Sequence, residues 1–223
     1  MIKDNLKSIT ENIKAACEKS NRKLQDVKLI AVSKKQRLDV IKEAKDCGVN
    51  QFGENYVQEL QEKYTSINNF DWHFIGHLQS NKAKVVAPMI SMLHSLDRLS
   101  LAEKLNKALT HQLPVLVQVN VSGESSKEGV SPEQLSNFLK KLESYEHLQI
   151  CGLMTMPPWA ESAEDSRKYF AKLKTLLEKH KPELSRPELF KELSMGTSQD
   201  YPVAVEEGAT YIRLGSVLLG QRK

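Results

Sequence analysis

The sequence is poor in cysteine and has no long hydrophobic run. Its 3 cysteines, Cys17, Cys47 and Cys151, lie far apart and form no CxxC pair, which indicates free thiols in a reducing compartment. The first residues include charged and amide side chains where a secretory signal peptide needs an apolar core. No apolar segment is long enough to span a bilayer. We therefore expect a soluble, cytoplasmic protein without a membrane partner.

Motifs for nucleotides and nucleic acids are missing as well. No GxGxxG follows the first expected strand, and no GxxxxGK[ST] occurs anywhere in the chain. The net charge of +4 and the pI of about 8.8 are mildly basic, but lysines and glutamates are interspersed along the sequence. Because no basic stripe results, the composition argues against a nucleic-acid partner.

The sequence does contain a regular alternation of apolar, strand-like runs and helical segments. Strands are predicted at residues 27–34, 51–53, 72–75, 92–94, 114–119, 150–153, 190–193 and 211–214. Helices are predicted at residues 2–19, from Leu38 to a stop at Gly48, and at 56–64, 82–86, 99–109, 132–142, 163–180 and 201–207. Eight alternations in 223 residues favour one (β/α)8 barrel domain, residues 1–223, over an open doubly wound sheet.

The two ends of the chain depart from a regular barrel. A helix precedes the first strand, and so few residues follow the eighth strand that the last helix is expected to be short or missing. The N-terminal helix is then able to cover part of the barrel. Two polar loops, 122–129 and 157–159, follow the fifth and sixth strands on the face where barrels build their sites. They either rim a site or are mobile, and we expect mobility for the first.

Lys34 ends the first apolar run, which is rich in β-branched residues. Such a run predicts a strand buried on both faces in a parallel sheet, so its C-terminal end lies on the face of a barrel that carries sites. A lysine there is a candidate Schiff-base nucleophile. The alternative is a solvated lysine that opens the following loop. Lys35 is its neighbour, and strand parity alone does not decide which of the two points into the barrel mouth.

Two loops of small residues follow the seventh and eighth strands. They are residues 194–198 and 213–216, and they are expected to lie side by side on the same face. Glycines and hydroxyls in these two loops of an α/β barrel are typical of a phosphate site. Each loop alone also fits a turn, with Ser198 as an N-cap before Tyr201. Together with Lys34 they favour a phosphorylated aldehyde, of which pyridoxal 5'-phosphate (PLP) is the commonest cofactor.

These residues belong to a wider family resemblance. The chain resembles the pyridoxal phosphate homeostasis protein family, which consists of single-domain relatives of the alanine racemase N-terminal barrel. The matching blocks are AVSK (31–34), FGENYVQE (52–59), WHFIGHLQSNK (72–82), HSLD (94–97), GLM (152–154), LSMG (193–196) and RLGS (213–216). Their common order along nearly the whole chain makes the resemblance specific.

The resemblance implies a role for each site residue. Lys34 forms the imine with PLP, and Lys35 is a charge of the loop. Asn55 lies near the ring, and Arg213 faces the pyridine nitrogen. The residues implied around the phosphate are Ser194, Gly196, Gly215 and Ser216. Thr197 stands where the family usually has a methionine, and a threonine there leaves the loop able to bind phosphate.

Arg213 bears on the chemistry as well. A permanently cationic guanidinium opposes protonation of the pyridine nitrogen, which disfavours transamination and decarboxylation. The alternative is a strand-end arginine that pairs with Glu206 or Glu207.

Three functions are compatible with these residues. We expect first a non-catalytic PLP-binding protein, a monomer, that buffers or delivers the cofactor in vitamin B6 and amino-acid homeostasis, with apo PLP-dependent enzymes as possible partners. The second is a PLP-dependent amino-acid racemase, although the related racemases use a tyrosine from a second domain and the chain ends too early to contain one. The third is a barrel that binds another phosphorylated metabolite without a covalent bond.

Two further residue pairs are set aside. His73 and His77 have the spacing of helical zinc ligands, but on a strand four residues span roughly 13 Å, so the two side chains cannot share an ion. Glu54 and Glu59 are not spaced as a glycosidase pair. We expect Glu59 to lie on a solvated helix face.

Overall fold

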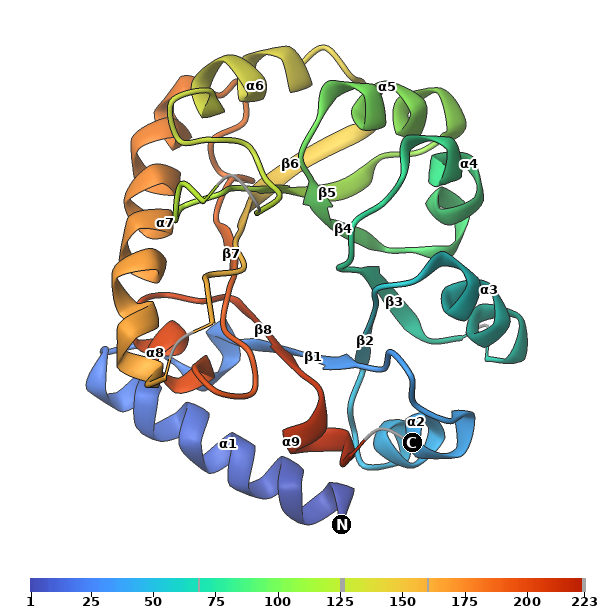
Figure 1. The fold of residues 1–223 in the computed structure, drawn as a ribbon, viewed down its shortest axis with the longest axis vertical. Helices are drawn as coiled ribbons and strands as arrows, with labels where there is room; N and C mark the ends of the chain where they lie inside the picture. The colour runs from blue at the N-terminus through green and yellow to red at the C-terminus, as the bar shows by residue number, and fades with distance from the viewer. Residues whose placement is uncertain (68, 125–126, 160, 222–223) are drawn as a thin grey trace.

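A computed structural model describes residues 1–67, 69–124, 127–159 and 161–221. In these residues eight parallel strands close into a barrel, with each strand paired to the next along the chain and β8 paired to β1 (Figure 1). The strands are β1 (Lys28–Val32), β2 (Gln51–Glu54), β3 (Asp71–Phe74), β4 (Met92–Leu96), β5 (Leu113–Gln118), β6 (Leu148–Met154), β7 (Glu192–Ser194) and β8 (Tyr211–Leu214). The predicted (β/α)8 barrel is therefore confirmed.

The helices surround this barrel on the outside, as Figure 1 shows. They are α1 (Ile2–Lys19), α2 (Leu38–Asp46), α3 (Val57–Ser66), α4 (Ala83–Val86), α5 (Leu99–Ala108), α6 (Leu135–Leu142), α7 (Arg167–His180), α8 (Tyr201–Glu206) and α9 (Ser216–Leu219). None of the helices in the described part of the chain has both the length and the apolar character that a membrane crossing requires.

Burial on both faces explains why these segments form parallel strands. In β1, Ile30, Ala31 and Val32 are buried in succession, because alternate residues face the barrel interior and the surrounding helices. The helices bury only one side. α6, for example, buries Leu135 together with its neighbours three and four residues on, which is the spacing of an amphipathic helix.

The extra N-terminal helix lies where the sequence suggested. α1 packs along α8 and α9 (Figure 1), and Asn12 on α1 donates a hydrogen bond of 2.8 Å to the Tyr201 hydroxyl. Arg22, just after α1, donates to the carbonyls of Val205 (2.6 Å) and Ala209 (2.8 Å). α9 has only 4 residues, so the expectation of a short last helix is confirmed.

Several boundaries differ from the prediction. β7 begins at Glu192 rather than at residue 190, because Leu189 and Phe190 close turns with hydrogen bonds to Arg186 and Pro187. α6 begins at Leu135, since residues 132–134 form a turn. β1 ends at Val32, so Lys34 lies in a turn after the strand. Of the loop predicted to be mobile, residues 125–126 lie outside the described part of the chain.

Candidate functional site

A cavity of about 580 Å³ opens at the C-terminal ends of the strands. Six of the eight residues predicted to bind the cofactor line it: Lys34, Asn55, Thr197, Arg213, Gly215 and Ser216. They come from the ends of β1, β2, β7 and β8, so the parallel order of the strands brings them together. Ser194 and Gly196 are not among the lining residues.

Lys34 sits in a tight turn whose backbone is held from several sides. Ser33 donates a backbone hydrogen bond of 3.0 Å to the Gly53 carbonyl, and Gln36 closes the turn with a bond of 3.0 Å to the Ser33 carbonyl. Lys35 adopts a φ of 57°, the left-handed region that ends a strand. Lys34 is half-buried in the cavity wall, whereas Lys35 is exposed and lines a different depression. The geometry thus favours Lys34 over Lys35.

A buried ion cluster supports this turn from below. The Lys63 ammonium contacts Glu54 Oε1 (2.6 Å) and Glu59 Oε2 (2.8 Å), and it donates to the Ser33 carbonyl at 2.8 Å. Glu54 also accepts from the Ser33 hydroxyl at 2.7 Å, and Glu59 accepts from the Lys35 backbone N–H at 2.7 Å. The groups on both sides of Lys34 are therefore held by three charged side chains.

Glu59 differs from its predicted role as a solvated side chain. It is partly buried and takes part in this cluster, because α3 places it one turn before Lys63. Burial raises the pKa of Glu54 above its ordinary value, although the nearby Lys63 charge opposes that rise. For Glu59, burial acts in the same direction, but hydrogen bonds from Lys63 and from the Lys35 backbone outweigh it and lower the pKa.

The loops after β7 and β8 contact each other at the cavity wall. The Gly215 backbone N–H donates to the Ser198 hydroxyl at 3.4 Å, and both residues line the cavity. Thr197 directs its backbone N–H (2.7 Å) and its hydroxyl (3.2 Å) to Asp200 Oδ1. Asp200, not Ser198, is the residue that precedes α8. The alternative interpretation of Ser198 as an N-cap is therefore wrong.

Gly196 has a supporting position rather than a lining one. Its φ is 90°, and a Cβ there would lie 2.5 Å from the Ala204 Cβ. A side chain would clash with α8, so glycine is needed to let this loop pass over the helix. Gly196 lies next to the lining residue Thr197, and its expected position near a phosphate stays a prediction.

Arg213 is buried at the base of the cavity, with only 3% of its surface exposed. It donates to the Ser194 hydroxyl (2.6 Å), the Thr155 carbonyl (2.9 Å) and the Met156 sulfur (2.9 Å). Burial lowers the pKa of Arg213 to about 10, so the guanidinium stays charged near neutral pH.

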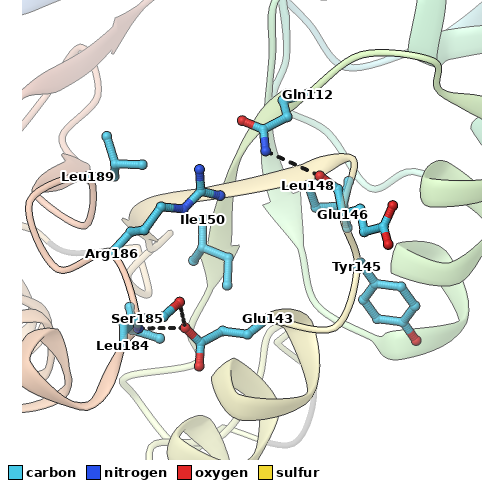
Figure 2. A pocket seen from close by; sticks show the side chains of 10 residues that line it. All are labelled: Gln112, Glu143, Tyr145, Glu146, Leu148, Ile150, Leu184, Ser185, Arg186 and Leu189. Carbon is cyan, nitrogen blue, oxygen red and sulfur yellow. Dashed lines mark hydrogen bonds between the residues drawn. The ribbon is translucent and has the colours of Figure 1, made fainter.

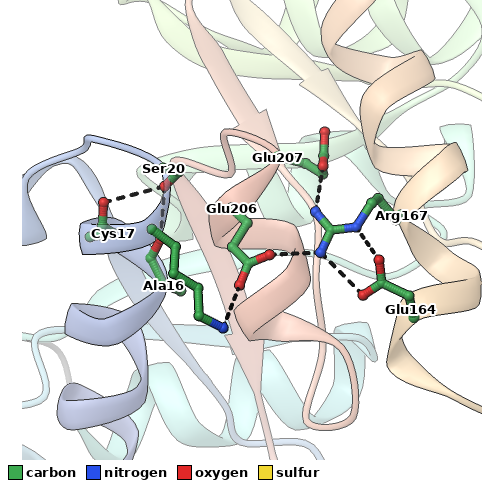
Figure 3. Close-up of polar contacts among 8 residues, drawn as sticks. Ala16, Cys17, Ser20, Glu164, Arg167, Glu206 and Glu207 are labelled. Carbon is green, nitrogen blue, oxygen red and sulfur yellow. Dashed lines mark hydrogen bonds and ion pairs between the residues drawn. The ribbon is translucent and has the colours of Figure 1, made fainter.

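The alternative pairing of Arg213 with Glu206 or Glu207 is wrong. Both glutamates bind Arg167, at 2.6 Å each, and Arg167 also contacts Glu164 (Figure 3). Lys19 on α1 adds a fourth contact to this cluster through Glu206 at 3.3 Å. These charges fasten α1, α7 and α8 to one another outside the barrel.

Ser194 lies behind Arg213, fully buried inside the barrel. Its hydroxyl is shared between Arg213 and His94 Nδ1, at 2.6 and 2.8 Å. Ser194 thus contacts the lining residue Arg213 without itself lining the cavity, and its expected contact with a phosphate stays a prediction.

Asn55 supplies an unsatisfied acceptor in the cavity wall. Its Oδ1 is buried, and within the described residues it has no hydrogen-bond partner. A buried carbonyl oxygen without a donor costs free energy unless a ligand or water provides one. The cavity thus combines an amine, a guanidinium, hydroxyls and an orphaned acceptor, which fit the aldehyde, ring nitrogen, phosphate and ring hydroxyl of PLP.

Several lining residues were missed from the sequence. His77, in the loop after β3, lines the cavity. Its Nδ1 lies 2.9 Å from Glu128 Oε1 and 3.7 Å from Asp97 Oδ2. His73 instead points into the barrel and contacts His94, in agreement with the rejection of a shared zinc site. Glu128 comes from the loop after β5, and no local pattern in the sequence links it to His77.

Known proteins resemble this chain over nearly its whole length. Residues 5–223 match the family described as alanine racemase, N-terminal domain. The pyridoxal phosphate homeostasis protein of Aquifex aeolicus is 41% identical, over 99% of this chain and 98% of that protein. This chain belongs to the pyridoxal phosphate homeostasis protein family. Another member, from Haemophilus influenzae, is 39% identical over 99% of this chain and 96% of its own length.

Solved structures place the family on the same barrel. PipY of Synechococcus elongatus with PLP bound is 33% identical, has a TM-score of 0.84, and is matched over 99% of this chain and 100% of its own. An alanine racemase of Clostridium difficile is 19% identical and has a TM-score of 0.72. The match covers 96% of this chain but only 55% of the racemase chain. That second likeness shows the shared fold alone.

Proposed function

We propose that this protein binds PLP in the cavity at the C-terminal ends of the strands and carries it without turning over a substrate. In this role it buffers or delivers the cofactor in vitamin B6 and amino-acid homeostasis, in the cytoplasm and as a monomer. The observation that carries the proposal is the convergence of Lys34, Asn55 and Arg213 on one cavity. Support comes from the family, which contains PipY, a protein with a PLP-bound structure.

Each cavity residue has a role in this proposal. PLP supplies an aldehyde to which an amine can bond covalently, and the Lys34 amine is the group placed for that bond. Asn55 Oδ1 accepts a hydrogen bond from the ligand, which satisfies the orphaned oxygen. Ser198, Gly215 and Ser216 hold the phosphate through hydroxyl and backbone donors.

Arg213 disfavours transamination and decarboxylation through its effect on the ring, whereas racemisation stays compatible with it. It is a permanent donor and a positive charge, so it binds an unprotonated pyridine nitrogen and opposes its protonation. The ring is then a weak electron sink, and the reactions that need a strong one are disfavoured. The names of the curated relatives, which describe homeostasis and not a reaction, support the same proposal.

Transfer to an acceptor tests this function directly. We expect the PLP-loaded protein to lose its visible absorbance when it is mixed with an excess of an apo PLP-dependent enzyme, whose activity appears in step. We expect no amino-acid turnover above that of free PLP. The Lys35→Ala variant is the matched control, because Lys35 lies outside the cavity, and it should behave as the unaltered protein. Racemisation of an amino acid that disappears in Lys34→Ala would overturn the proposal in favour of a racemase.

A further inference from the structure

A line of five polar side chains crosses the barrel interior from the cavity to its opposite end. Arg213 donates to Ser194, and the Ser194 hydroxyl lies 2.8 Å from His94 Nδ1. His94 Nε2 lies 2.8 Å from His73 Nδ1, and His73 Nε2 lies 3.5 Å from Asp71 Oδ2. Asp71 begins β3, at the end of the barrel away from the cavity, where it also accepts from Ser91 and Gln51.

The chemistry of the two ends sets the direction of every hydrogen bond in this line. Arginine can only donate, so the Ser194 oxygen accepts from Arg213 and its own O–H is left to donate to His94 Nδ1. Then His94 Nε2 carries the proton and donates to His73 Nδ1. At the other end, the Asp71 carboxylate can only accept, so His73 carries its proton on Nε2. Arg213 at one end and Asp71 at the other therefore require the same direction of donation, from Arg213 toward Asp71.

This order requires His94 to be neutral, with a bare Nδ1. The groups that face it agree: His73 from β3, Ser194 from β7, Arg213 and the Tyr211 ring from β8, and the Lys28 charge from β1. Burial lowers the pKa of His94 well below its ordinary value, and the charges of Arg213 and Lys28 act in the same direction. At the far end, hydrogen bonds from His73 and Ser91 lower the Asp71 pKa despite its burial.

We propose that His94 is a positioning residue of the PLP site, which fixes the Ser194 hydroxyl and through it the plane of the Arg213 guanidinium. This inference rests on the proposed function. Bonds from two different nitrogens, one to Ser194 and one to the Thr155 carbonyl, set that plane. If His94 no longer accepts from Ser194, the hydroxyl can rotate and Arg213 loses its fixed acceptor.

Two substitutions of His94 distinguish its role as a hydrogen-bond acceptor for Ser194 from a role in packing alone. In His94→Asn, the side-chain oxygen can replace Nδ1 as the acceptor for Ser194. His94→Gln extends instead toward the position of Nε2, keeps a donor for His73 and loses that acceptor. The readout is the ratio of affinities for PLP and for its analogue in which carbon replaces the ring nitrogen, because only PLP offers an acceptor to Arg213.

We expect His94→Gln to lower this ratio by about tenfold and His94→Asn to leave it within about twofold of the unaltered protein. An unchanged ratio in His94→Gln, in a variant that still binds PLP, would overturn the role of His94. Failure of the unaltered protein to bind PLP at all would instead refute the proposed function, so the two outcomes are distinguishable.

A second measurement needs neither a variant nor PLP. Nitrogen NMR of the histidine rings in the unaltered protein should show His94 with a bare Nδ1 and a protonated Nε2, between about pH 6 and pH 9. The opposite tautomer, or a positively charged ring in this range, would overturn the proposed order of hydrogen bonds. This test holds even if the substituted proteins do not fold.

Discussion

A lysine lies at the start of β1 and another just beyond its end, and the two lysines have different surroundings. Lys28, at the start of the strand, contacts Glu192 at 2.7 Å and the Tyr211 hydroxyl at 3.2 Å. Partial burial lowers the Lys28 pKa, but the hydrogen bond and charge of Glu192 outweigh that effect and raise it. Lys34, beyond the end of the strand, lines a cavity of about 580 Å³. The residue type is the same, but Lys28 is held by an ion pair and a hydrogen bond, whereas Lys34 lines a cavity.

The same contrast separates the two cavities near these ends. A smaller cavity of about 260 Å³ lies beside the starts of β5 and β6 (Figure 2). Some of its polar groups bind one another: Ser185 donates twice to Glu143, and Gln112 donates to the Glu146 carbonyl. In the larger cavity, Asn55 Oδ1 has no such partner within the described residues. An unsatisfied buried acceptor among its lining residues therefore distinguishes the larger cavity from the smaller one.

The largest effect that we predict is a difference between the Lys34→Ala and Lys28→Ala variants. Lys34→Ala should abolish the visible absorbance of covalently bound PLP while the fold persists, because no other amine is placed for the bond in the described part of the cavity. Lys28→Ala, the matched variant at the other end, should keep the absorbance. Spectra of both purified proteins with added PLP provide the check. If Lys35→Ala loses the absorbance instead, the assignment of the nucleophile is wrong.

The sequence was sufficient to predict which residues meet at the cavity where their position follows from the order of the strands. Lys34, Asn55, Arg213, Gly215 and Ser216 each come at or just after the end of a strand, and parallel strands bring such residues to one face. Their meeting could therefore be predicted without knowledge of any long-range contact.

The sequence was insufficient where a side chain turns into the barrel interior. Strands buried on both faces have no polar side that reveals the inward residues, so the contact between Ser194 and His94 could not be predicted. Glu59 was missed for a related reason. A glutamate on a helix fits a solvated face equally well, and only the fold brings it to the Lys35 backbone.

A smaller effect is expected from the cluster beneath the Lys34 turn. Lys63→Ala leaves the buried Glu54 carboxylate without its counter-charge, which should lower the free energy of unfolding by about 3–5 kcal/mol. Because the Glu54 pKa is raised in the folded state, the native protein binds more protons than the unfolded chain. Without Lys63 the folded-state pKa of Glu54 should rise further, because the nearby positive charge that opposes the rise is gone. The extra loss of stability in the variant should therefore be small at pH 4.5, begin above the raised pKa of the unaltered protein, and grow until Glu54 of the variant is also ionised.

Urea unfolding at several pH values measures this effect. Lys107→Ala is the matched control, because Lys107 forms an ion pair with Glu103 on an exposed helix surface, and it should change stability little at any pH. A Lys63→Ala protein as stable as the unaltered one at neutral pH would show that the cluster does not hold the turn.

The smallest effect concerns the phosphate end of the cavity. Ser216 is exposed in the cavity wall after β8, and its hydroxyl is expected to donate to a phosphate oxygen. A hydrogen bond to a charged group contributes about 1.5–3 kcal/mol, so Ser216→Ala should weaken PLP binding by roughly ten- to a hundredfold. Affinity for unphosphorylated pyridoxal should change little, since that ligand lacks the group that Ser216 contacts. Titration of both ligands followed by absorbance gives the two constants, and equal losses for both would show that Ser216 does not bind the phosphate.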